Sequence, residues 1–226
     1  MGDYTQRSGS LRENMKNMTR LEQVGYIWDL YKLPILIGAV LLVMLVAFLV
    51  TLANPDPETL FMGASVNLTV SDEGKAYLTE DIFEMMDGTD PEKQRVDLVY
   101  RYLPDAEKDP RLADTERMAM IAMVSTKLLD YMLLDEEALK QYRGSGMIGP
   151  VDKVLTPAQL AAFEGKLLPV TAEDGSEYLG VVDITDTAFA RDCITGSDKV
   201  YIAFPGNTVR ADRLDTFLDW LLAWEG

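Results

Sequence analysis

The chain has 226 residues, a formal net charge of −16, one cysteine and no histidine. Without histidine, Ser-His-Asp and Cys-His catalytic units are excluded, and so are zinc sites built from the usual histidine and cysteine ligands. The single cysteine, Cys193, cannot form a disulfide within the chain, so the fold must be held by its core alone. We therefore expect no cofactor, no metal and no enzymatic activity.

Acidic residues are concentrated in the larger, C-terminal part of the chain. Residues 1–32 contain five Lys or Arg and four Asp or Glu, which leaves 16 of the 21 basic and 33 of the 37 acidic residues for the remainder. Such a surface repels phosphate backbones, so nucleic acid is not an expected partner. The acidity indicates solubility in the first place, and a cationic partner is the alternative.

An uncharged run at residues 33–52 predicts one transmembrane helix. At about 1.5 Å per residue, its 20 residues span roughly 30 Å, the thickness of the hydrocarbon core. Pro34 is expected in the first turn, where a missing N–H is tolerated. A cleaved signal peptide ending near Ala53 is the alternative, but the apolar run is long and a mostly polar tail of 32 residues precedes it.

Basic residues near the apolar run predict its orientation. Lys16, Arg20 and Lys32 lie within 20 residues on its N-terminal side, and the 20 residues after Leu52 contain no Lys or Arg. The positive-inside rule then places the N-terminus in the cytoplasm and the C-terminal domain outside it. We expect a single-pass cell-membrane protein with the lipid bilayer as a partner.

Four segments follow from this reading: a cytoplasmic tail (1–32), the transmembrane helix (33–52), a linker (53–59) and an extracytoplasmic α/β domain (60–226). In the tail, apolar residues fall on one helical face, which predicts either an amphipathic helix on the inner membrane surface or a disordered tail. The apolar residues of that face are Leu11, Met15, Met18, Leu21 and Val24.

Alternation of apolar residues with periods of two and of three to four predicts the elements of the domain. Strands are expected at 60–70, 95–103, 131–134, 167–171, 177–184 and 199–204, and helices at 75–86, 114–129, 136–142, 156–166 and from about 209 to the C-terminus. Strands that alternate with helices predict a mostly parallel sheet with helices on both faces, and the pair at 167–184 predicts an added antiparallel hairpin.

Several stretches resemble extracellular solute-binding proteins of the type 2 periplasmic-binding superfamily. They are Ser125-Thr-Lys-Leu-Leu129, Tyr131-Met-Leu-Leu-Asp135, Glu136-Glu-Ala-Leu-Lys-Gln-Tyr142, Gly146-Met-Ile-Gly-Pro-Val-Asp152 with Leu155, and Tyr201-Ile-Ala-Phe-Pro-Gly-Asn-Thr208. The stretch Tyr26-Ile-Trp-Asp-Leu-Tyr-Lys-Leu-Pro34 resembles membrane-anchored proteins of Gram-positive bacteria with such a domain.

The resemblance implies a single, truncated binding-protein lobe. The chain has no lipobox cysteine, and the domain is too short for two full lobes. On this basis we expect a membrane-tethered, solute-binding-like module that recognises a small solute, a peptide or a neighbouring membrane protein such as a transporter.

Ligands in open α/β sheets lie beyond the carboxyl ends of parallel strands. That rule predicts a ligand site formed by polar residues that follow the expected strands, although the same residue types also serve as helix caps and turns. The candidates are Ser71, Asp72, Tyr102, Asp135, Glu136, Asn207 and Thr208.

Two further functions remain open at this point. The chain could be a structural or assembly subunit of a membrane complex that binds no ligand. It could also be an envelope hydrolase that uses carboxylate pairs, which requires two carboxyl groups facing each other across a cleft.

Overall fold

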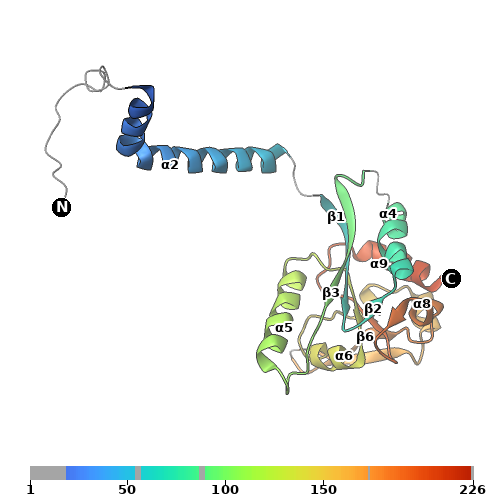
Figure 1. The fold of residues 1–226 in the computed structure, drawn as a ribbon. Coiled ribbons are helices and arrows are strands. Elements are labelled where there is room, and N and C mark those ends of the chain that lie inside the picture. Colours follow the sequence, from blue (N-terminus) through green and yellow to red (C-terminus); the bar gives the residue numbers. More distant parts are fainter. Residues whose placement is uncertain (1–18, 54–56, 87–89, 173, 225–226) are drawn as a thin grey trace. The chain divides into compact units, whose positions relative to one another are not determined.

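The computed structural model of the protein describes residues 19–53, 57–86, 90–172 and 174–224, without the side chains of residues 26, 27, 29 and 30. The chain divides into two compact units, residues 1–56 and 57–226 (Figure 1). Each unit is described by itself below.

The first unit contains one long helix, α2 (Arg20–Ala53). Its segment Tyr31–Ala53 has a mean hydropathy of 3.1 and no buried residues, so it is a candidate membrane anchor or signal sequence. Pro34 lies inside the helix, so the prediction that it occupies the first turn was wrong, because the helix begins before the apolar run. A proline inside a helix removes one hydrogen bond and kinks it, and Figure 1 shows α2 bending part-way along.

The described residues include only the C-terminal part of the expected tail helix. Leu21 and Val24 lie within α2 and are exposed, whereas Leu11, Met15 and Met18 fall outside the described residues.

The second unit is built on a six-stranded sheet of order β3-β1-β4-β8-β6-β5. The strands are β1 (Glu58–Val66), β3 (Gln94–Arg101), β4 (Tyr131–Leu134), β5 (Leu167–Thr171), β6 (Glu177–Asp183) and β8 (Tyr201–Ala203). A separate pair joins β2 (Thr69–Val70) to β7 (Ile194–Thr195).

The sheet is mixed, so the expectation of a mostly parallel sheet was wrong. Strand β1 runs parallel to β3 and β4, but β8 is antiparallel to β4, β6 to β8 and β5 to β6. The β5–β6 hairpin was predicted. The reversal of β8 was not, because it depends on the path of the chain between residues 184 and 201 and not on the strand's own composition.

Helices cover both faces of the sheet, which gives three layers. On one face, α5 (Pro110–Ser125) and α6 (Glu136–Tyr142) contribute Met120, Val124, Leu139 and Tyr142 to a core with Met62, Met132 and Leu134. The other face is covered by α3 (Asp72–Ala76), the π-helical turn η1 (Tyr77–Asp81), α4 (Ile82–Met85), α8 (Ala188–Cys193) and α9 (Ala211–Leu222), together with η2 (Val151–Lys153) and α7 (Pro157–Ala162).

Alternation along the central strands explains the two cores. Phe61 and Leu133 enter the α9 side, while their neighbours Met62 and Leu134 enter the α5 side. Strand β4 is a continuous apolar run between β1 and β8, and all four of its residues are fully buried. In the last helix, α9, periodic apolar residues predict a buried stripe of Leu214, Phe217, Leu218, Leu221 and Leu222; the first four are buried, and Leu222 is exposed.

Local capping decides several element boundaries. Thr156 and Gln159 form a capping box at the start of α7. Helix α5 begins earlier than predicted, since Asp109 caps it and Pro110 occupies its first turn. The strand expected over residues 60–70 is divided into β1 and β2 at Asn67, whose φ of 58° cannot continue a strand.

Candidate functional site

The carboxyl ends of the three parallel strands meet at one edge of the sheet, and Asn67 fastens them together. Its backbone N–H donates to the Arg101 carbonyl (3.0 Å), and its side-chain oxygen accepts from the Leu103 N–H (2.7 Å). Its side-chain nitrogen donates to Asp135 Oδ1 (3.3 Å). Asn67 therefore links the ends of β1, β3 and β4, a role that sequence reasoning missed. The available signal was an asparagine after an apolar run, since asparagine tolerates positive φ.

Two of the candidate ligand residues at this edge cap helices. Ser71 Oγ accepts from the Gly74 N–H (3.1 Å) at the start of α3, and Asp135 Oδ1 accepts from the Ala138 N–H (2.7 Å) at the start of α6. These hydrogen bonds satisfy helix N–H groups that otherwise lack partners.

The other candidates at this edge are held less tightly. Asp72 lies in the first turn of α3. Glu136 forms an exposed ion pair with Lys140 (3.2 Å), and Tyr102 is 68% exposed. The structure thus brings Tyr102, Asp135 and Glu136 to the same edge as Asn67, with Tyr102 and Glu136 exposed to solvent.

Asn207 and Thr208 lie at the opposite edge of the sheet, so the seven candidate residues do not form one site. Both follow β8, and β8 is antiparallel to β4, which brings its carboxyl end beside the amino end of β4. Asn207 Nδ2 donates to the Val124 carbonyl (2.8 Å), and Thr208 Oγ1 donates to Asp130 Oδ1 (2.6 Å). The prediction that they join the carboxyl-end group was wrong for this topological reason.

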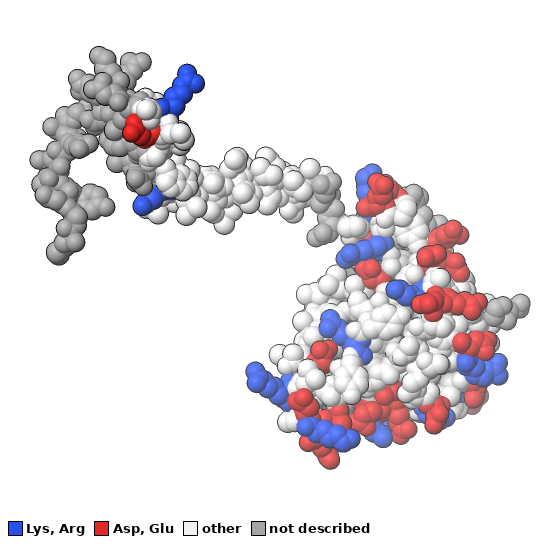
Figure 2. Space-filling model, in the orientation of Figure 1, with Lys and Arg blue, Asp and Glu red and all other residues white. Residues whose placement is uncertain are grey.

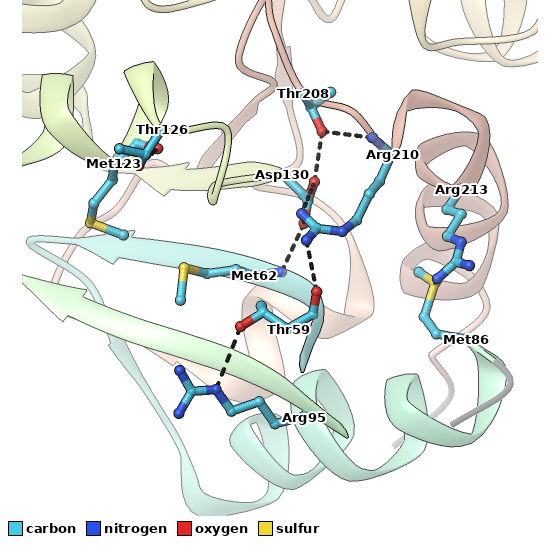
Figure 3. A network of polar contacts seen from close by, with 10 residues as sticks. All are labelled: Thr59, Met62, Met86, Arg95, Met123, Thr126, Asp130, Thr208, Arg210 and Arg213. Atoms are coloured by element: carbon cyan, nitrogen blue, oxygen red, sulfur yellow. Dashed lines mark hydrogen bonds and ion pairs between the residues drawn. The ribbon is translucent and has the colours of Figure 1, made fainter. Parts of the chain in front are cut away.

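A buried ion pair lies beside Thr208, at the amino end of β4 (Figure 3). Asp130 is fully buried and precedes β4, and Arg210, which is 19% exposed, precedes α9. Arg210 Nη1 lies 3.2 and 3.1 Å from the two oxygens of Asp130, and Nη2 donates to the Thr59 carbonyl (2.7 Å). The Met62 N–H also donates to Asp130 Oδ2 (2.9 Å).

Burial raises the pKa of the Asp130 carboxyl, while the Thr208 hydroxyl, the Met62 N–H and the Arg210 guanidinium act in the opposite direction. Both oxygens of Asp130 are hydrogen-bonded, and the Asp130 N–H returns a bond to the Met62 carbonyl (2.8 Å). The network joins β1, β4 and the start of α9 and leaves no carboxylate oxygen free for a substrate. We interpret it as a structural lock.

Two pockets formed by the described residues are open to solvent and lie away from the carboxyl ends of the parallel strands. One of about 530 Å³ is lined by Ile121 and Val124 of α5, by the turn at residues 145–147 and by Asn207. Another lies beside Arg210 and includes Glu58 and Asp212. Neither has the enclosed, apolar shape with a few convergent polar groups that is typical of small-molecule sites.

No family model, curated protein or solved structure matches this chain. The resemblance to solute-binding proteins therefore stays a prediction, and function must be inferred from the molecule itself.

Strand β3 is the outermost strand on one side of the sheet. Among the described strands, only β1 pairs with β3, so the other side of this eight-residue strand carries no strand partner. Tyr100 and Tyr102 at its end are 46% and 68% exposed. Figure 2 shows Lys, Arg, Asp and Glu side chains at both ends of the domain and along one flank, with uncharged surface between them.

The other edge of the sheet is protected. Strand β5 contains Pro169, which has no N–H to donate, and its pairing with β6 shifts register between Leu168 and Pro169. Proline and bulges are common means by which sheet edges avoid pairing with other chains. Strand β3 contains no proline, although its pairing with β1 also shifts register, between Thr59 and Phe61. Its open edge carries exposed tyrosines and is the edge suited to bind a partner.

Proposed function

We propose that the chain is a membrane-tethered interaction module: α2 anchors it, and the acidic α/β domain lies outside the cytoplasm and binds another protein along β3. The observation that carries this proposal is the outer edge of β3 from Val96 to Arg101, which has no strand partner among the described strands, together with the exposed Tyr100 and Tyr102. Extended partners commonly bind by adding a strand to such an edge, where main-chain hydrogen bonds provide affinity.

A protein partner fits the domain better than a small solute. A solute would be expected beyond the carboxyl ends of the parallel strands, where Ser71 and Asp135 already cap helices and Asn67 is fully engaged. The edge of β3, by contrast, offers backbone groups and exposed aromatic side chains, which are enriched at protein interfaces. A neighbouring membrane protein, including a transporter, would meet these requirements.

The same surface supports a role as an assembly subunit. A permanent partner would cover Tyr100 and Tyr102 in every copy, whereas a recruitment module would leave part of the population free. The two roles share one surface and differ in how long the complex lasts.

Topology is tested with an introduced cysteine. Cys193 is buried in the α9-side core, so it labels poorly in the native fold whichever side of the membrane the domain occupies. Asp198→Cys in a Cys193→Ala background places a thiol on an exposed residue. Labelling of intact cells by a membrane-impermeant maleimide is the expected result. Labelling only after the cells are opened would overturn the extracytoplasmic placement.

The interaction itself is tested by photo-crosslinking of the full chain in its native membrane. A benzophenone amino acid at Tyr102 should give a discrete higher-mass adduct. The same group at Met118, which is 62% exposed on α5, is the matched control and should not. Equal labelling at both positions, or none at either, would contradict a binding role for β3.

A further inference from the structure

We propose that the partner at the β3 edge is a second copy of this chain, paired antiparallel to the first about a two-fold axis through Val99. This inference rests on the proposed function of β3 and identifies its partner. Three observations carry it: the direction of the backbone groups, the charges along the strand, and the exposed tyrosines.

The backbone groups of β3 alternate in a known phase. The carbonyls of Lys93 and Arg101 accept from the N–H groups of Glu58 and Asn67, so odd-numbered residues face β1. The N–H and C=O groups of the even-numbered residues therefore point to the open side. From Val96 onward those residues are Val96, Leu98, Tyr100 and Tyr102, whereas the N–H of Gln94 donates to the Asp90 carbonyl (2.8 Å).

An antiparallel pair can exchange hydrogen bonds only if the residues opposite each other both face the gap. A two-fold axis at Val99 meets this condition, since it sets Leu98 opposite Tyr100 of the second copy and Val96 opposite Tyr102. The exposed tyrosines then pack against apolar side chains on the same face. Pairs of aromatic and β-branched or aliphatic residues stabilise neighbouring strands.

Charge selects this register over its neighbours. An axis at Val99 sets Asp97 opposite Arg101 of the second copy, and by symmetry this ion pair forms twice. An axis at Leu98 would set Arg95 opposite Arg101, which places like charges together. An axis at Tyr100 would set Asp97 opposite Leu103 and Arg101 opposite Val99, so neither charge gains an opposite partner.

Both charged residues are available for the new contact. The Asp97 and Arg101 side chains are 30% and 33% exposed. Within one copy, Asp97 pairs with Arg95 (2.7 Å) and Arg101 lies 3.6 Å from Glu116. On the α5 face of the joined sheet, Arg101 would lie between Glu116 of its own copy and Asp97 of the second, a compact alternating cluster. Tethering both copies to one membrane raises their effective concentration, which favours such an edge contact.

Charge reversal gives a sharp test on the full chain in detergent. Asp97→Arg sets Arg against Arg101, and Arg101→Asp sets Asp against Asp97, so either variant alone should dimerise roughly ten- to a hundredfold more weakly. Mixing the two variants restores both ion pairs and should restore the dimer, as measured by light scattering. Lys108→Glu, at an exposed site away from β3, is the control and should dimerise as the unaltered chain does.

Disulfide trapping tests the register independently. In a Cys193→Ala background, Val99→Cys lies on the two-fold axis at a position not hydrogen-bonded across the gap, with Cα atoms about 4.5 Å apart, within disulfide range. Oxidation should give a covalent dimer. Tyr102→Cys is the control. Each introduced thiol would lie opposite Val96 of the second copy, six residues along the strand from the other introduced thiol, so it should not crosslink.

The outcomes separate the two proposals. A dimer trapped at Val99 with rescue by mixing supports both. A Tyr102 photo-adduct with a mass other than that of two copies keeps the interaction module and overturns self-pairing. Crosslinking at Leu98→Cys or Tyr100→Cys in preference to Val99→Cys overturns the register, and no adduct of any kind overturns both.

Discussion

Replacing Arg210 with methionine tests whether the Asp130 network is the structural lock that its geometry indicates. The change removes both contacts from Nη1 to the Asp130 carboxylate and the bond from Nη2 to the Thr59 carbonyl. Methionine keeps most of the side-chain volume, so the main effect is an unpaired charge in a fully buried position. Breaking one partner of a buried pair destabilises proteins by about 3–5 kcal/mol, because the remaining charge is uncompensated.

For a domain of this size, such a loss lowers the melting temperature by roughly 10 °C. Urea unfolding of the full chain in detergent measures it. Two reporters are available: tryptophan fluorescence, since Trp220 stacks on Tyr77 in the folded state, and maleimide labelling of the buried Cys193. Arg213→Met is the matched control, because the Arg213 guanidinium contacts Met86 Sδ at 4.0 Å and does not reach Asp130.

The stability loss of Arg210→Met should also change with pH in a definite direction. Arg210 opposes the rise in the pKa of Asp130 that burial causes, so the variant's Asp130 should hold its proton to higher pH. A carboxyl whose folded-state pKa is raised stabilises the fold below its unfolded value, about 3.9, and that contribution is lost as pH rises through the folded pKa. The deficit of Arg210→Met should therefore be small in acid and grow toward neutral pH. Adding Asp130→Asn should recover part of it.

The lock interpretation fails if Arg210→Met and Arg213→Met unfold at the same urea concentration at neutral pH. It also fails if the deficit of Arg210→Met does not change between acid and neutral pH.

Three further substitutions probe other parts of the domain. Burial raises the pKa of the Tyr142 phenol to about 12, and its hydroxyl has no hydrogen-bond partner among the described residues, so Tyr142→Phe should be nearly neutral at pH 7. The unaltered chain should lose stability as pH rises from about 10 to 12, since the unfolded phenol ionises first, and Tyr142→Phe should lose less in an alkaline urea titration. Gly63→Ala would drive the new Cβ into the Tyr131 ring. The free energy of unfolding, measured by denaturation, should fall by about 3 kcal/mol or more. The double variant Gly63→Ala/Tyr131→Leu should recover part of this loss. Asn67→Ala removes two side-chain hydrogen bonds and places alanine at positive φ, so a loss of about 2–3 kcal/mol is expected by the same method; full stability in this variant would show that the strand ends are held elsewhere.

The buried polar groups make the domain depend on a few cross-strand bonds. Asn67 joins three strand ends at one edge, and Asp130 joins two strands and the start of α9 at the other. Between them, the sheet is packed on both faces by apolar side chains. A rigid sheet of this kind holds β3 in an extended form ready for a partner, so little ordering is needed when a partner strand binds.

Elements with a strong local signal were predictable from sequence. The apolar run of α2, the capping box of α7, the buried run of β4 and the stripe of α9 each arise from residues close together in the chain. Their periodicity and caps identify them because the responsible interactions form within one element. The positive φ of Asn67 interrupts that pattern, and for this reason a single strand was expected where two exist.

The candidate site was less predictable, because its geometry depends on strand direction. Sequence identified the polar residues after each strand, yet β8 runs antiparallel to β4, and this alone moves Asn207 and Thr208 to the far edge. The pairing of Asp130 with Arg210, 80 residues apart, and the exposure of the β3 edge likewise follow from which strands become neighbours. Sequence by itself determined which segments are apolar enough to be buried or to enter a membrane. Only the tertiary structure decided which backbone edge stays open, because hydrogen-bond partners in a sheet are set by contacts between distant segments.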